Sequence, residues 1–171
     1  MKKLVLVAIV FFGLNLNAQD VKGVIKINPI GLLYSANITY EKPINESGSA
    51  MIRFRYYHQR LHYNVNDVEK FAMPVGTMDF KFGYRFYLSK KHEAPRGFYV
   101  SPTANIMLKA EETDSYYSFT EKSTIFGAGV HAGKQWIWGK FAFDLYGGLD
   151  VLFHTDKVIM PVGGLSIGFV H

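Results

Sequence analysis

The sequence predicts an all-β protein, an eight-stranded antiparallel up-and-down transmembrane β-barrel. Apolar and polar residues alternate with a period of two in segment after segment, as in strands that have one apolar face. The connections fall into two groups that alternate along the chain, as an up-and-down barrel requires. Of the 171 residues, 49% are hydrophobic, which excludes a disordered chain.

The N-terminal segment 1–18 is predicted to be a cleaved secretory signal peptide. Met1–Lys3 is basic, Leu4–Leu14 is apolar throughout, and Ala18 supplies a small residue at the expected cleavage point. This apolar run is shorter than the roughly 20 residues that a membrane-spanning helix needs. A buried N-terminal helix is the alternative. We therefore expect a barrel domain over 19–171 and a location in the cell outer membrane of a Gram-negative envelope.

Charge and cysteine content exclude several classes of protein. The formal net charge of +5 at pH 7 includes Lys2 and Lys3 of the predicted signal peptide. Because no run of five or more basic residues is present, we expect no nucleic-acid partner. The chain has no cysteine, which excludes a disulfide scaffold, a thiolate metal site, a cysteine nucleophile and a lipid-modified N-terminal cysteine. An exported chain without cysteine suits a bacterial envelope.

Eight segments carry the alternation. In Met78–Leu88, for example, Phe80 and Phe82 alternate with Asp79 and Lys81. The eight predicted strands are Val21–Asn28, Leu32–Glu41, Met51–Tyr63, Met78–Leu88, Phe98–Ala110, Lys122–Trp138, Phe141–Phe153 and Val158–Val170. The pattern blurs at 58–60, which we interpret as a bulge or as the strand leaving the apolar zone.

The connections are expected to gather at two ends of the barrel. One group is Asn28–Gly31, Asn64–Pro74, Glu111–Glu121 and His154–Lys157, and the other is Lys42–Gly48, Ser89–Arg96 and Gly139–Lys140. The first group carries more acidic than basic residues, and the second carries more basic ones. With eight strands both termini fall at the second end, so this end is predicted to face the periplasm and the first group to face outward.

Alternation alone leaves open which face lines the barrel. A soluble, lipocalin-like barrel has its apolar face inside, whereas a membrane barrel has it outside. An eight-stranded barrel is only wide enough for side chains to fill it, and the polar face carries small residues such as Gly127, Gly129 and Ser166. The bulky apolar face is therefore predicted to face lipid. Aromatic residues at the second end suit a membrane interface: Tyr40, Phe86, Phe98, Trp136, Trp138, Phe141 and Phe169.

Four stretches of the chain also resemble a known family: KINPIGLLYSANITYEKPI, FGYRFYLSKKHEAPRGFYV, FGAGVHAGKQWIWGKFAFDL and GGLSIGFV. They are similar to a family of small Gram-negative outer-membrane β-barrels of unknown function, with an eight-stranded architecture like that of OmpA and OmpX. The resemblance covers nearly all of 19–171. It implies a fold and an outer-membrane location, but not an activity.

On this assignment of faces, the lumen holds charged side chains of both signs. We expect a structural charge network of Glu41, Arg53, Arg55, Asp79, Lys81, Arg85, Asp144 and Asp150, with Lys26 and Lys109 on the same face. Buried charges are tolerated when they are paired and hydrogen-bonded. Because eight strands leave no wide channel, we predict a closed, charge-filled lumen rather than an ion-selective pore.

No arrangement in the sequence specifies catalysis, so no catalytic residue, cofactor or metal is predicted. A Ser–His–Asp set drawn from the outer rim is conceivable, from His62, Asp114, Ser115, His154 and Asp156, but no spacing defines its geometry. His58 and His62 lie about 13 Å apart on an extended strand, too far to share a metal.

The sequence thus predicts a non-enzymatic outer-membrane barrel with a structural or surface-interaction role. Its expected partners are outer-membrane lipid, the barrel assembly machinery, and an extracellular or envelope protein bound through the outward loops. Of these loops, Glu111–Tyr117 is acidic and contains tyrosines. Two alternatives stay open: a lipocalin-like soluble ligand-binding barrel and a lipid-modifying outer-membrane enzyme.

Overall fold

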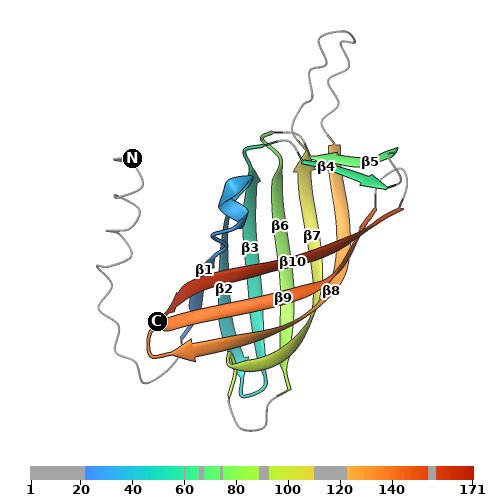
Figure 1. Ribbon diagram of the computed structural model, residues 1–171. Coiled ribbons are helices and arrows are strands. Elements are labelled where there is room, and N and C mark those ends of the chain that lie inside the picture. Colours follow the sequence, from blue (N-terminus) through green and yellow to red (C-terminus); the bar gives the residue numbers. More distant parts are fainter. Residues whose placement is uncertain are drawn as a thin grey trace, which may run out of the picture.

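The computed structural model describes residues 22–59, 61–65, 68–73, 75–88, 93–109, 123–153 and 157–171, with the backbone alone at 61–65, 68–73 and 123. In these residues, eight strands close into one antiparallel barrel in the order β1-β10-β9-β8-β7-β6-β3-β2 (Figure 1). The barrel strands are β1 (Val24–Ile27), β2 (Ser35–Asn45), β3 (Gly48–Tyr57), β6 (Met78–Tyr87), β7 (Gly97–Lys109), β8 (Ser123–Trp138), β9 (Phe141–Phe153) and β10 (Lys157–Val170). The predicted all-β, eight-stranded antiparallel fold is confirmed. The predicted signal peptide lies outside the described residues.

The helical content of the described residues is small. The 3-10 helix η1 (Gly31–Leu33) precedes β2. Within the described part of the chain, no helix has the length and apolar character needed to cross a membrane.

Alternation along the strands separates the two faces of the barrel wall. On β9, Asp144 and Asp150 are buried in the lumen, whereas Leu145 and Leu149 between them are 50% and 54% exposed on the outer face. The pattern on β7 is equally regular. Successive side chains of a strand point to opposite faces, so a single register places the charged set inside and the bulky apolar set outside.

The barrel has two ends, which we name by their connections. At the turn end, β2 leads to β3 and β8 leads to β9, and the C-terminus lies here (Figure 1). At the loop end lie Tyr57 of β3, Met78 of β6 and Phe153 of β9. The turn between β8 and β9 needs only two residues because Gly139 adopts a positive φ of 56°.

The predicted strand Met51–Tyr63 is wrong beyond Tyr57. At His58 and Gln59, the backbone N–H groups turn away from β6 and donate to the carbonyl oxygen of Tyr34, at 3.1 and 3.3 Å. The chain then forms a separate two-stranded sheet of β4 (Leu61–Val65) and β5 (Val68–Met73), beside the loop end in Figure 1. Most of the predicted loop Asn64–Pro74 is therefore part of a hairpin, in which it pairs with itself and with the last three residues of the predicted strand, Leu61–Tyr63.

Other strand boundaries also differ from the prediction, including the start of β3 at Gly48 rather than at Met51. The strand predicted from Leu32 begins at Ser35, because the N–H groups of Leu33 and Tyr34 donate to Ile30 and Gly31 in a helical turn. The predicted connection Lys42–Gly48 is shorter than expected, since β2 continues to Asn45 and pairs with Gly48.

The closing strand β1 covers only part of its neighbour β10. β1 pairs with Ile167–Val170, so the rest of β10 has a ladder partner on β9 alone among the described strands. Pro161 lies in this part of β10. Proline has no N–H to donate, and this is tolerated on the side of β10 that has no neighbouring strand. The side chain of Asn28, the residue that follows β1, lies beside Gly164 of this part.

Apolar side chains occupy both ends of the lumen. At the turn end, Val24, Ile137, Ala142 and Val170 pack together. At the loop end, a second cluster consists of Tyr57, Met107, Ile125, Leu152, Val158 and Met160. The charged residues lie between these two clusters.

Candidate functional site

The lumen is the candidate functional site, and strands β2, β3, β6 and β9 position its charged side chains. The eight residues of the predicted charge network all project into it. Seven of them are buried, and Arg55 is half-buried. Their different heights on the strands divide them into two groups, one near each end.

The turn-side cluster consists of Lys26, Glu41, Arg85 and Asp144. The Lys26 ammonium donates to Glu41 Oε2 at 2.6 Å and to Asp144 Oδ2 at 2.9 Å. The Arg85 guanidinium lies 3.0 Å from the same Glu41 oxygen and 2.8 Å from the same Asp144 oxygen. Each cation thus contacts both carboxylates, and the four formal charges cancel. Such a network suits a dry interior, where an unpaired charge is costly.

Neutral side chains complete the turn-side cluster. Tyr87 Oη donates to Glu41 Oε1, and Tyr99 Oη donates to Asp144 Oδ1 at 2.7 Å. Gln135 accepts from Lys26 and donates to the carbonyl oxygen of Pro95, which lies in the connection between β6 and β7, at 2.7 Å. Together with the apolar cluster at the turn end, these side chains occupy the turn-side half of the lumen.

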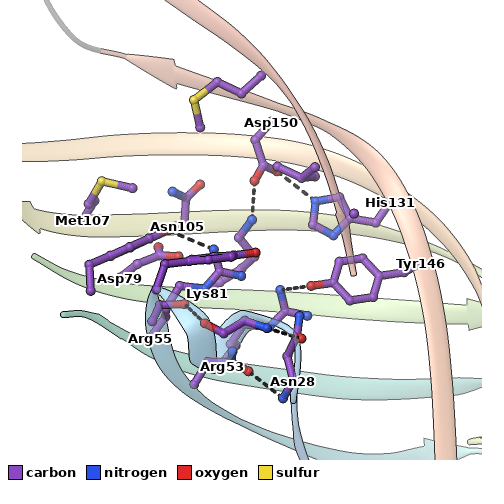
Figure 2. Close-up of a pocket in the computed structure, with 18 of the residues that line it drawn as sticks. Asn28, Arg53, Arg55, Asp79, Lys81, Asn105, Met107, His131, Tyr146 and Asp150 are labelled. Atoms are coloured by element: carbon purple, nitrogen blue, oxygen red, sulfur yellow. Dashed lines mark hydrogen bonds and ion pairs between the residues drawn. The ribbon is translucent and has the colours of Figure 1, made fainter. Parts of the chain in front are cut away.

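Closer to the loop end, Asp150 is shared by two partners. Lys81 donates to Asp150 Oδ2, and His131 Nε2 lies 2.9 Å from Asp150 Oδ1 (Figure 2). Lys81 and Asp150 are both buried, so each neutralises the other in the interior.

Two arginines on β3 have different surroundings. Arg53 donates to Thr39 Oγ1 at 3.1 Å and to Tyr146 Oη at 2.9 Å. Arg55 donates to Tyr57 Oη at 2.9 Å. In the part of the chain that the structure describes, neither guanidinium has a carboxylate oxygen within ion-pair distance, 4.0 Å.

The loop-side half of the lumen contains a cavity of about 280 Å³ that sequence reasoning did not identify. Figure 2 shows Arg53, Arg55, Asp79, Lys81 and Asp150 around it. We expected a closed, charge-filled lumen. In the turn-side half, the long side chains of Lys26 and Arg85 reach across the lumen to Glu41 and Asp144.

Sequence reasoning missed the neutral partners of these charges. The hydroxyls of Tyr87, Tyr99 and Tyr146, the amide of Gln135 and the imidazole of His131 all bind a predicted charged residue. The signal that could have found them is the same period-two pattern, since each lies on the lumen-facing side of its strand.

The conceivable catalytic set cannot be assembled from the described side chains. Asp114, Ser115, His154 and Asp156 lie outside the described residues, and at His62 only the backbone is described. The acidic loop Glu111–Tyr117 also lies outside them. Among the side chains that are described, no three or more His, Asp or Glu residues form a group that would hold a metal ion.

Comparisons with known proteins add no relative. No protein-family model, no curated protein and no solved structure matches the chain.

Proposed function

We propose that the protein is a non-enzymatic, integral β-barrel of the Gram-negative outer membrane, with a structural or surface-interaction role. The observation that carries this proposal is the inverted distribution of polarity: ionisable side chains lie inside, and bulky apolar ones lie outside. Val130, Leu145 and Leu149 are 58%, 50% and 54% exposed. A surface of this kind is unfavourable in water and favourable in a bilayer.

The outer face also suits the boundary between lipid and water. Phe98, Trp138 and Phe141 lie near the turn end and are 59%, 60% and 60% exposed. Amphipathic aromatic rings favour the headgroup level of a membrane. This supports insertion with the turn end toward the periplasm and the loop end outward. Outer-membrane lipid and the barrel assembly machinery are the partners that such a protein requires, and the outward loops are the proposed contact with other proteins.

The two alternatives, a lipocalin-like barrel and a lipid-modifying enzyme, each require a different structure. A lipocalin-like barrel carries its ligand in an apolar interior and has a polar exterior, the reverse of the arrangement on β9. A lipid-modifying enzyme needs a nucleophile and a base within hydrogen-bond reach. Lys26 and Arg85 are instead paired with Glu41 and Asp144, and Lys81 is paired with Asp150, which favours a structural role.

Cell fractionation and gel mobility test the proposal. The full-length gene product should fractionate with outer membranes, and after extraction it should run as a compact band without boiling and shift on heating. Recovery of the protein from the soluble periplasmic fraction would overturn the membrane assignment. Release of fatty acid or transfer of an acyl chain by the purified protein would overturn the non-enzymatic assignment.

A further inference from the structure

The loop-side cavity has an unbalanced set of charges. Among the described residues that line it, Arg53, Arg55 and Lys81 are opposed by Asp79 and Asp150, which leaves a formal excess of one positive charge when His131 is neutral. Lys81 has a direct carboxylate partner in Asp150. Asp79 lies directly opposite Arg55 in the β3–β6 ladder, so the excess belongs mainly to Arg53.

Unlike the cations of the turn-side cluster, the two arginines beside the cavity have no carboxylate partner within ion-pair distance among the described residues. There, each cation contacts two carboxylates. Around the cavity, the partners described for Arg53 and Arg55 are the neutral hydroxyls of Thr39, Tyr146 and Tyr57. A buried guanidinium that has only neutral partners is stabilised by an anion, and its planar fork of N–H groups matches a carboxylate.

The apolar part of the cavity lies at its loop end. Leu152 of β9, Met160 of β10 and Met107 of β7 line it there, in the same cluster as Tyr57. Arg53, Lys81 and Asp150 line the part closer to the turn end. The cavity thus has a charged part and an apolar part, an arrangement suited to a molecule with one charged end.

The size of the cavity limits what it can hold. At about 30 Å³ for each water-sized group, 280 Å³ has room for about nine non-hydrogen atoms. The positive excess of one matches a monoanion. A dianion such as phosphate would bring a second negative charge close to Asp79 and Asp150.

We propose that the loop-side cavity is a binding site for a small amphipathic monocarboxylate. The carboxylate accepts hydrogen bonds from the guanidinium of Arg53, with Arg55 adding positive charge, and the apolar body lies against Leu152, Met160 and Met107. The proposal goes beyond the proposed function. It depends only on the barrel geometry, and it holds whether or not the protein resides in the outer membrane.

Calorimetric titration of the purified full-length protein tests this site with a matched pair of probes. Benzoate has the required charge and about the required size, and benzamide has the same shape without the charge. Benzoate should bind at one site, at least about tenfold more tightly than benzamide, because only the anion forms charge-assisted hydrogen bonds with a guanidinium. Equal binding of the two probes, or no binding of benzoate at millimolar concentration, would overturn the proposal.

Two variants locate the binding. Arg53→Gln should weaken benzoate binding by about tenfold or more, whereas Arg96→Gln, a matched change at an exposed residue of the turn end, should leave it unchanged. Met160→Trp adds volume on the apolar side and should exclude benzoate without removing a charge. The heat shift on gels shows whether each variant is folded. If Arg53→Gln does not fold, Met160→Trp decides, and undiminished binding by either folded variant contradicts the site.

Discussion

At the scale of single residues, the turn-side cluster shows how buried charge is accommodated. Glu41 is fully buried, and its carboxylate accepts hydrogen bonds from four side chains: Lys26, Arg85, Ser49 and Tyr87. Its carboxylate is therefore a shared partner rather than half of a pair. Removal of a shared partner leaves two cations that depend on Asp144 alone.

Replacing this carboxylate should destabilise the barrel strongly. Glu41→Gln keeps the shape of the side chain and removes its charge, and should lower the free energy of unfolding by about 3–5 kcal/mol, as for a broken buried pair. Urea unfolding in lipid vesicles, followed by tryptophan fluorescence, measures the change. The matched control Glu46→Gln lies in the exposed turn between β2 and β3 and should be nearly silent. Equal, small effects of both changes would mean that the network is not stabilising.

At the scale of elements, close contact between neighbouring strands depends on glycine. A Cβ on Gly148 of β9 would overlap the carbonyl oxygen of Val130 on β8 and lie 2.7 Å from the Cα of His131. The adjacent Gly147 faces the outside, and the nearest atom to its Cβ would be the Val162 carbonyl oxygen at 3.8 Å. A side chain therefore has no room at Gly148 but has room at the adjacent Gly147.

Alanine substitutions should separate these two positions. Gly148→Ala forces the β8–β9 ladder apart and should lower the free energy of unfolding by about 1–3 kcal/mol, as overpacking does. Gly147→Ala should change it by no more than about 0.5 kcal/mol. The same urea titration compares the two variants. A larger loss at Gly147 than at Gly148 would mean that the inward and outward faces of β9 are exchanged.

At the scale of the whole molecule, the described residues place ion pairs across the turn-side half of the lumen and a cavity in the loop-side half. Eight strands limit the diameter, and the turn-side cluster with its apolar neighbours occupies the half that faces the turn end. The cavity of about 280 Å³ is confined to the loop-side half. From the described residues we therefore expect a binding volume in the lumen and no continuous wide path.

Planar-bilayer recordings examine this directly. The purified protein should show little steady conductance, because Lys26, Glu41, Arg85 and Asp144 bind one another across the lumen. A detergent-only bilayer supplies the baseline. Large and reproducible single-channel steps would contradict a closed lumen and would make the same charges the lining of a pore.

Which side of each strand faces the lumen follows from the sequence by itself. The period of two is a local property of extended backbone, so Asp79, Lys81 and Arg85 share a face in any strand that contains them. The small residues of that face then assign it to the inside. Eight strands and an inward charge network could be predicted because neither depends on how the strands are aligned.

Only the tertiary structure decided which of these residues meet. The partners Lys26 and Asp144 are 118 positions apart, and Lys81 and Asp150 are 69 apart. The stagger between neighbouring strands sets the height of each side chain in the lumen, and alternation carries no information about stagger. For the same reason, the sequence did not reveal that the two residues after β3 donate their N–H groups to Tyr34, or that Arg53 and Arg55 lie beside a cavity. These features arise from contacts between segments that are distant in the chain.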